Sequence, residues 1–548
     1  MMIRSASIFG LLIITVLVVA SCAEDSVSVR KTVPSVSILT PLDGASRSGV
    51  VDVTVDARDD SGVKSVEYYI NNELKSTDTA KPYLYELDLD SYDMGKVVSI
   101  YVKAIAYTGS EKSSGTITVT KDDSESPEVT IDNVTLENPP ADSTLMQGYL
   151  LTIEGTATDK EAITENNPTG ELSGKNKIIW YSDRQGMALR QGKTLKYRGF
   201  VLGDHKITMV ATDADGNTAK TFVNITVVDN DKDFVYIQEN DKDLAGIEEG
   251  EYTIGPPLFE EKTVFFSRPF LISKTELTMG EFIANYDEEL CIEVAKREDK
   301  KLLNKDTQEY VYLEGILSDT DKFGDYPAIF ITAYEFMEFC QTLSTQYGLT
   351  PAYEFFDKDN LTFDSKGVPI QPKKYMKARL LEGANGWRLP TEAEWEVAAS
   401  GLDVGKKYPW GNETPGARCN STSDPGPPAG VGAMINGRGI CPVLEYKEYR
   451  NRFGLYNMAG NVAEICSDMI TSDFSRPSGI DFVGFSEDSQ VYYVVKGGAW
   501  YQRGVEMQIG LRSLWIPFNW KGDQRDAWNS GFGVRLVRNL EPEDDPWK

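Results

Sequence analysis

Short segments in which apolar and polar residues alternate, each followed by a polar turn, dominate the first part of the chain. Between residues 35 and 121, Val51, Val53 and Val55 alternate with polar residues, and the turn Asp60–Gly62 follows them. A period of two places successive side chains on opposite faces of a β-strand, so that one face is buried. Many short strands separated by frequent turns fold as a β-sandwich. Residues 35–121 are therefore predicted to form an all-β sandwich.

A second segment, residues 127–229, has the same alternation. Ile207, Met209 and Ala211 alternate with polar residues, and the polar turn Thr212–Asn217 precedes a last strand. Both segments are similar to bacterial immunoglobulin-like domains, and the resemblance implies two immunoglobulin-like sandwiches. We name them the first and the second β module. In tandem they are expected to act as spacers or adhesive surfaces that hold the following domain away from a membrane.

The N-terminus has the pattern of a targeting segment. Arg4 precedes the apolar run Ile8–Ala20, which is too short for a confident membrane span, and small residues then lead to Cys22. This pattern resembles a bacterial lipoprotein signal, which implies a signal peptide over residues 1–21 and a lipidated tether over residues 22–34. The chain is then expected in the bacterial cell envelope, at the outer membrane or cell surface, held to the membrane by lipid on Cys22. The alternative is an ordinary secretory signal with an incidental cysteine.

Charge and histidine content exclude several kinds of function. The 548 residues include 84 acidic and 56 basic residues, for a net charge of −28, so nucleic acid is not expected as a partner. The chain has one histidine, His205. A site with several histidine ligands, or a Ser–His–Asp triad in the C-terminal part, is therefore excluded. His205 falls in a predicted strand and is expected at the surface or at a sheet edge.

From Asp233 onward the pattern changes, because tryptophan and glycine become more frequent and apolar segments become irregular. Three helices are predicted, at Thr278–Tyr286, Thr332–Tyr347 and Thr391–Ser400. The last begins with Thr391 as a capping residue and has an acidic first turn. Trp395 of this helix is expected to face the core.

A series of motifs in this region resembles the formylglycine-generating enzyme (sulfatase-modifying factor) family. In chain order the motifs are FVYIQ from Phe234, GEYTIG from Gly250, RPFLISKTELT from Arg268, GWRLPTEAEWEVAA from Gly386, YPWGN from Tyr408, NRFGLYNMAGNVAEICSD from Asn451, KGGAW from Lys496 and GFGVRLV from Gly531. The resemblance covers residues 233–540 and implies an α+β, loop-rich variant of the C-type-lectin-like fold. The chain is therefore predicted to be multidomain, with two all-β sandwiches followed by this domain.

The resemblance also locates a family active site, which this chain does not reproduce. Family oxidases hold Cu(I) with two cysteines that follow a Gly–Gly–Ser–Trp motif, and the matching positions after Gly497–Trp500 are Gln502 and Met507. An amide and a thioether do not replace two thiolates as ligands of a soft ion. A second branch of the family uses iron and a histidine cluster, and the C-terminal domain has no histidine. Neither copper nor iron is expected.

One metal site implied by the resemblance does keep its ligand types. The family binds calcium in the loop that corresponds to Asn457–Glu464. The matching ligands are the side chains of Asn457 and Glu464 and the carbonyls of Gly460 and Val462, all of which are oxygen donors. A structural calcium ion is therefore expected here. The alternative is that Asn457 and Glu464 only hydrogen-bond to the loop.

Five cysteines follow Cys22, in a compartment that permits disulfides. Cys419 and Cys441 flank a loop rich in glycine and proline and are the best candidates for a pair. The odd number leaves at least one thiol, and Cys340 is expected to be buried on its helix.

These features favour a lipid-anchored envelope protein whose C-terminal domain is non-catalytic and serves binding or scaffolding. Its cleft is expected at Trp500, Tyr501, Gln502, Met507 and Arg512, with a protein or glycan as the partner. For Trp500 and Arg512, core packing and a structural salt bridge are an equally weighted alternative. The alternative function is an oxidoreductase of the same family with a divergent active site.

Overall fold

The computed structural model describes residues 33–540 except 60–61, 122–125, 138–143, 165, 174–176, 214–215, 231, 240–251, 255–261, 287–300, 304–309, 313–323, 330, 332, 357–361, 364–368, 372–376, 382, 404, 422–439, 471–478, 481–491 and 518–530. The predicted signal peptide, Cys22 and most of the tether lie outside these residues. Within them, no helix has the length and apolar character needed to cross a bilayer.

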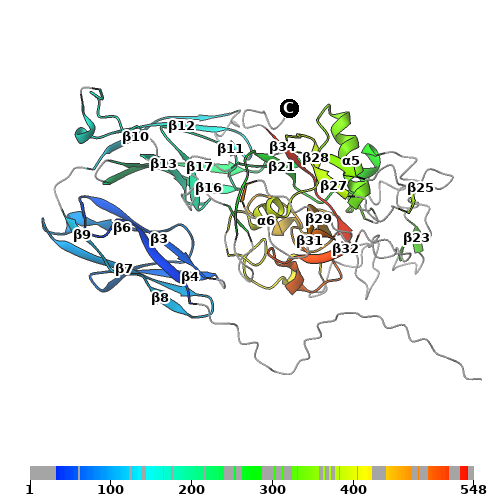
Figure 1. Ribbon diagram of the computed structural model, residues 1–548, viewed down its shortest axis with the longest axis horizontal. Helices are drawn as coiled ribbons and strands as arrows, with labels where there is room; N and C mark the ends of the chain where they lie inside the picture. Colours follow the sequence, from blue (N-terminus) through cyan, green and yellow to red (C-terminus); the bar gives the residue numbers. More distant parts are fainter. Residues whose placement is uncertain are drawn as a thin grey trace, which may run out of the picture.

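The first β module consists of two sheets of mainly antiparallel strands, which enclose one apolar core (Figure 1). Val51, Val53 and Val55 point into this core, as the alternation predicts. One sheet has the order β1 (Ser35–Thr40), β3 (Val50–Arg58) and β6 (Tyr83–Asp88). The other has the order β2 (Ala45–Arg47), β9 (Ile117–Lys121), β7 (Val97–Ala106), β4 (Val63–Ile70) and β5 (Glu73–Asp78), with β8 (Glu111–Ser113) paired to β7.

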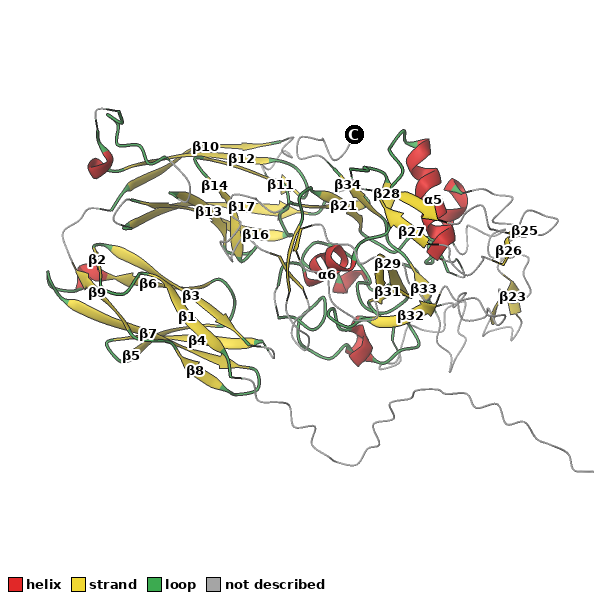
Figure 2. Ribbon diagram, viewed as in Figure 1, coloured by secondary structure: helices red, strands yellow, loops and turns green. Residues whose placement is uncertain are grey.

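The second β module also has two sheets around a core of its own (Figure 2). The smaller sheet contains β10 (Glu128–Leu136), β12 (Leu151–Thr158) and β15 (Thr194–Tyr197). The larger has the order β11 (Leu145–Met146), β17 (Thr218–Val228), β16 (Gly203–Thr212), β13 (Ile178–Ser182) and β14 (Met187–Gln191).

The placement of His205 at a surface or edge is wrong. His205 lies on β16, which is flanked by β13 and β17, and only 2% of its surface is exposed. It shares the inner face with Ile207, while its neighbours Asp204 and Lys206 are exposed. The alternation therefore continues through His205, and a polar ring occupies an inward position because both ring nitrogens have hydrogen-bond partners.

The two modules lie side by side rather than end to end (Figure 1), and β17 packs across β3. The Ser48 amide donates to Asn217 at one end of this contact. At the other end, the Lys81 backbone carbonyl approaches Gly186 closely. A Cβ atom added to Gly186 would lie 3.0 Å from the Lys81 carbonyl oxygen. The first module therefore doubles back along the second.

Among the described residues, the C-terminal domain combines two four-stranded sheets, four smaller sheets and three helices (Figure 2). The first sheet contains β18 (Phe234–Ile237), β21 (Phe270–Ser273), β34 (Val537–Asn539) and β28 (Trp387–Arg388). The second contains β32 (Ser513–Pro517), β31 (Tyr492–Lys496), β29 (Ala463–Ile470) and β33 (Phe532–Gly533). The smaller sheets are β19 (Tyr252–Ile254) with β20 (Lys262–Phe265) and β30 (Gly479–Ile480), β22 (Lys301–Leu303) with β23 (Tyr310–Tyr312), β24 (Tyr353–Phe356) with β27 (Lys377–Leu380), and β25 (Thr362–Phe363) with β26 (Pro369–Gln371).

The three helices lie where the sequence predicts them. They are α1 (Met279–Asn285), α5 (Ala333–Gln346) and α6 (Glu392–Ser400). Thr391 caps α6 by accepting the Glu394 amide, and Glu394 in turn accepts the Thr391 amide, which completes a capping box. Trp395 of α6 is fully buried, as expected. The helix is buried along its whole length and forms the centre of the domain.

Candidate functional site

The segment Lys496–Arg512 follows strand β31 and turns sharply at two glycines. Gly497 and Gly498 have φ values of 82° and 71°, a left-handed backbone that favours glycine. A Cβ on Gly498 would lie 2.7 Å from the Met507 sulfur, so a larger residue would displace this side chain. The Gly–Gly pair is thus required both by the turn and by the close approach of Met507.

The two positions that correspond to the family's copper ligands serve to fold this segment. The Gln502 Oε1 accepts the Ala499 amide at 2.7 Å, and its Nε2 donates to Glu506 at 3.4 Å. Met507 ends the short 3-10 helix η8 (Gly504–Met507) and is fully buried. Copper does not fit these two residues, because neither an amide that closes a turn nor a neutral thioether supplies a thiolate.

Trp500 and Met507 belong to the interior rather than to an open cleft. Trp500 is 2% exposed and meets Tyr501 edge to face, with ring centres 5.4 Å apart. Its amide donates to the Asn461 carbonyl at 2.8 Å. Met507 packs with Tyr408 and Cys419 in a small apolar cluster. For Trp500, the core-packing alternative describes this geometry.

Arg512 belongs to a cluster of charged side chains between the Lys496–Arg512 segment and helix α6. Its guanidinium forms a two-point ion pair with Glu392, with Nε 2.7 Å from Oε1. The ammonium of Lys496 lies 2.6 Å from Glu396 and 3.6 Å from Glu392. Glu392 and Glu396 are one turn apart on α6, so both face the end of β31. Arg512 therefore holds the loop to the helix, which is the structural salt bridge of the alternative interpretation.

The loop expected to bind calcium is organised by an arginine. The carboxylate of Glu464 receives two hydrogen bonds from Arg535, each 2.8 Å long, and a third of 2.6 Å from the Trp395 indole. Asn457 uses its amide nitrogen to donate to Glu276 and to the Val443 carbonyl. The side chains of Glu464, Arg535 and Trp395 are all buried. As arranged, the donor set does not fit calcium, because its carboxylate already has a cationic partner; the calcium ion stays a prediction.

Glu276 joins this network, and the sequence does not single it out. It is fully buried and accepts the side-chain amides of Asn457 and Asn461 at 2.9 and 3.0 Å. Burial, together with the nearby Glu464 carboxylate, raises the pKa of Glu276 to about 8. Both asparagines have positive φ values, 50° and 62°, a left-handed backbone that asparagine adopts more readily than most residues. Glu276 thus fixes the loop through the side chains of Asn457 and Asn461.

The predicted disulfide between Cys419 and Cys441 is wrong. In the described part of the chain both residues are thiols. Their surroundings explain this, because Cys419 packs against Met507, whereas the Cys441 sulfur lies near the side chains of Asn420 and Asn461. Cys340 is fully buried on α5, as predicted.

Comparisons with known proteins agree with this fold. Residues 236–540 match the family described as the sulfatase-modifying factor enzyme 1-like domain, which is more than half of the 548 residues. The chain belongs to this family. Residues 34–121, the first β module, match the bacterial Ig domain. The sulfatase-modifying factor-like domain therefore follows at least one immunoglobulin-like domain, as the resemblance predicts.

Three relatives illustrate the range of names within the family. The formylglycine-generating enzyme of Streptomyces coelicolor is 44% identical over 95 residues, which are 17% of this chain and 30% of that enzyme. The chaperone protein LppX of Paenibacillus barcinonensis is 31% identical over 196 residues, 33% of this chain and 64% of that protein. The inactive C-alpha-formylglycine-generating enzyme 2 of Mus musculus is 28% identical over 210 residues, 36% of this chain and 60% of that protein. This chain covers less than two thirds of each.

Proposed function

We propose that this protein is a lipid-anchored component of a bacterial cell envelope whose sulfatase-modifying factor-like domain binds a partner without catalysis. The observation that carries the proposal is the use of Gln502 and Met507. Gln502 closes a turn onto Ala499, and Met507 is fully buried against Gly498. Residues at the family's copper positions therefore stabilise a loop. The names of the mouse relative, an inactive enzyme, and of LppX, a chaperone, support a non-catalytic role.

The finer architecture belongs to the same proposal. The second β module would be a further immunoglobulin-like sandwich over residues 127–229. The C-terminal domain would adopt the C-type-lectin-like fold over residues 233–540. Both assignments are supported by the sheet order and by the small share of helix in the described residues.

The partner, a protein or a glycan, would contact the exposed tip of the Lys496–Arg512 segment. Arg503 and Val505 are exposed there, Val505 by 61%. Nearby, the partly buried ring of Trp410 stacks on Tyr408 and packs against the Met507 cluster. A cation and an apolar side chain on this segment, with an indole that packs against its Met507 cluster, offer the groups that interfaces favour. Arg503→Glu with Val505→Asp is expected to abolish recovery of the partner after cross-linking in cells, whereas Lys196→Glu on the exposed face of β15 is not.

The test of the non-catalytic role is a copper and substrate assay. Purified protein is titrated with Cu(I) against a competing chelator and is incubated with a peptide that contains a cysteine–x–proline–x–arginine motif. We expect no copper-dependent conversion of the thiol to an aldehyde. The double variant Gln502→Cys/Met507→Cys is expected to gain Cu(I) affinity, because it restores two thiolates five residues apart. Aldehyde formation by the unaltered protein would overturn the proposal.

One observation favours the oxidoreductase alternative enough to include it in this assay. Cys419 and Met507 occupy the same apolar cluster, so a thiol and a thioether share one environment. If the unaltered protein binds Cu(I), Cys419→Ser is the variant that separates the two functions. Loss of the bound copper in Cys419→Ser would support a divergent metal site, and unchanged binding would point to another location.

The anchor is tested by fractionation. Cells that express Cys22→Ser are expected to release the protein from the membrane fraction, because the thiol that would carry lipid is absent. A protein that stays in the membrane fraction after this substitution would contradict lipid attachment at Cys22.

A further inference from the structure

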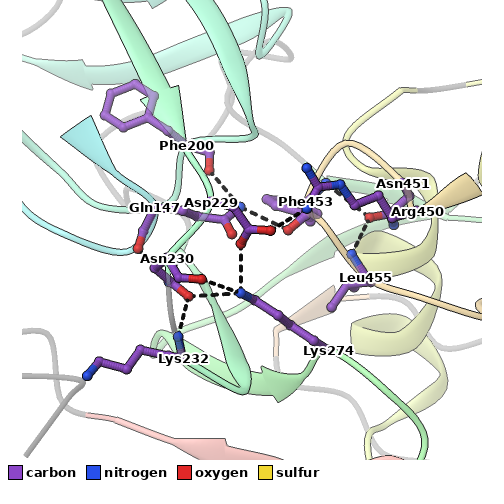
Figure 3. Close-up of polar contacts among 10 residues, drawn as sticks. All are labelled: Gln147, Phe200, Asp229, Asn230, Lys232, Lys274, Arg450, Asn451, Phe453 and Leu455. Atoms are coloured by element: carbon purple, nitrogen blue, oxygen red, sulfur yellow. Dashed lines mark hydrogen bonds and ion pairs between the residues drawn. The ribbon is translucent and has the colours of Figure 1, made fainter. Parts of the chain in front are cut away.

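The second β module is joined to the C-terminal domain through buried polar contacts (Figure 3). Lys274, which follows β21, is 8% exposed, and its ammonium lies 2.7 Å from Asp229 and 2.9 Å from the Asn230 carbonyl. Arg450 forms a second ion pair with Asp229. Two cations of the C-terminal domain therefore hold the end of β17. Separation of the two domains would leave Lys274 without these partners.

A buried amide lies in the same joint. The Nε2 of Gln147 donates to the Phe200 carbonyl at 3.3 Å and to the Phe453 carbonyl at 3.0 Å (Figure 3). Gln147 is 1% exposed, and its backbone carbonyl accepts a hydrogen bond of 2.7 Å from the Asn230 side-chain amide. A single side chain thus links a loop of the second module to a loop of the C-terminal domain.

The joint also has an apolar part, formed by the loop before β16. Val201 is fully buried in the same core cluster as Trp395 and Phe453 of the C-terminal domain. The adjacent Leu202 amide donates to the Arg452 carbonyl at 2.8 Å. His205 holds this loop, because its Nε2 lies 2.8 Å from the Val201 carbonyl. The second module therefore contributes a residue to the core of its neighbour.

The contact between the two β modules is of a different kind. Lys220 of β17 reaches Asp52, at 3.3 Å, and Glu86 of the first module. The Lys220, Glu86 and Asp52 side chains are 30%, 56% and 14% exposed, so water reaches all three, and the cores of the two modules are separate among the described residues. The hydrogen bond from the Ser48 amide to Asn217 at the same contact is buried and 3.4 Å long. Ion pairs that water reaches contribute little to stability. They are also screened when salt shortens the Debye length from about 8 Å to about 3 Å.

We propose that the chain works as a folding arm. The second module and the C-terminal domain form a rigid head, and the first module is an arm that swings away from it when the Lys220 ion pairs break. In the folded-back state the start of β1 pairs with Arg58, at the end of β3. The Lys81 carbonyl approaches Gly186 of the second module near this end of the first module. If the anchor of the proposed function precedes β1, opening moves the head away from the membrane. This last consequence rests on the proposed function, whereas the opening itself does not.

The experiment measures the opening in solution, so that it does not depend on the anchor. The full chain with Cys22→Ser is studied by small-angle X-ray scattering at 0.05 and 1 M NaCl. High salt and Lys220→Glu are each expected to raise the radius of gyration and the maximum dimension. Lys220→Glu combined with Asp52→Lys and Glu86→Lys is expected to restore the compact values at low salt. Lys196→Glu, on β15 of the same module, is the matched control and should leave both values unchanged.

Hydrogen exchange in the same samples locates the movement. The Leu202 amide, which bonds to Arg452 across the joint, should keep its protection in high salt and in Lys220→Glu. An unchanged radius of gyration under both conditions would mean that the two modules are fixed together and would overturn the proposal. A larger radius accompanied by loss of Leu202 protection would overturn it as well, because the head would then open at its own joint.

Discussion

Among single residues, His205 gives the stability of the second module a calculable pH dependence. Burial is the main reason that the pKa of His205 falls to about 4, against the raising effect of its hydrogen bond with Val201; Asp183 also raises the pKa, and Arg184 and Arg452 lower it. Both ring nitrogens are engaged, with Ser182 at Nδ1 and Val201 at Nε2. The folded state therefore favours the neutral ring.

We predict that this histidine destabilises the fold as the pH falls from 6.5 to 4. In that interval the unfolded chain binds more protons than the native one, so the free energy of unfolding decreases. A pKa difference of about 2.5 units corresponds to about 3 kcal/mol at most. His205→Gln keeps a donor and an acceptor without a titrating group. The difference in unfolding free energy between the two proteins, measured with urea at several pH values, should shift by this amount, and an unchanged difference would contradict the prediction.

Glu276 is expected to give the free energy of unfolding the opposite pH dependence, a decrease as the pH rises. Its folded pKa of about 8 lies above the ordinary value of 4.5. Its contribution to stability is therefore fully present below pH 4.5 and is lost as the pH rises through 8. Glu276→Gln is expected to be less stable than the unaltered protein at pH 5, because Gln has one acceptor oxygen where Glu276 accepts Asn457 on one oxygen and Asn461 on the other. Thermal unfolding between pH 5 and 9 should show the variant gaining relative stability as the pH rises, and parallel curves would refute this role.

Among elements, the loop Asn457–Glu464 shows how one non-local contact changes the meaning of a motif. Its oxygen donors are those that calcium needs, yet the Glu464 carboxylate is held by Arg535, 71 positions further along the chain. We predict that removal of calcium with EDTA leaves the melting temperature unchanged. Arg535→Met should lower the free energy of unfolding by about 3–5 kcal/mol, because it leaves Glu464 buried without a partner. A calcium-dependent rise in melting temperature that Glu464→Gln abolishes would establish the predicted calcium site instead.

The elements that the sequence predicts well are those with local causes. Alternation defines β3 through Val51, Val53 and Val55, and the Thr391–Glu394 capping box defines the start of α6. The loss of the copper thiolates is also readable, because Gln502 and Met507 follow the glycines at fixed spacing. The burial of His205 depends instead on β16 lying between two strands, and the role of Arg512 depends on Glu392, 120 positions away. Such pairings arise only from the tertiary fold.

At the scale of the whole molecule, two contacts of different strength divide the chain into an arm and a head. The joint of the head buries Gln147, Val201 and Lys274, whereas the contact of the arm combines partly exposed ion pairs around Lys220 with the hydrogen bond from Ser48 to Asn217. A net charge of −28 favours extended arrangements at low salt, so the Lys220 pairs act against a general repulsion. The fold-back is therefore specific to these pairs rather than a result of overall attraction.

The head is expected to unfold as one cooperative unit, which Gln147→Ala tests. The substitution leaves the buried Phe200 and Phe453 carbonyls without their shared donor, at a cost of about 1–3 kcal/mol. Hydrogen exchange at increasing urea should show peptides from β16 and from α6 losing protection at the same lowered urea concentration, while peptides from β7 of the first module are unaffected. Lys196→Ala, which alters an exposed residue of the same module, should leave all midpoints in place. If only the β16 peptides shift, the second module unfolds independently and the joint does not couple the two domains.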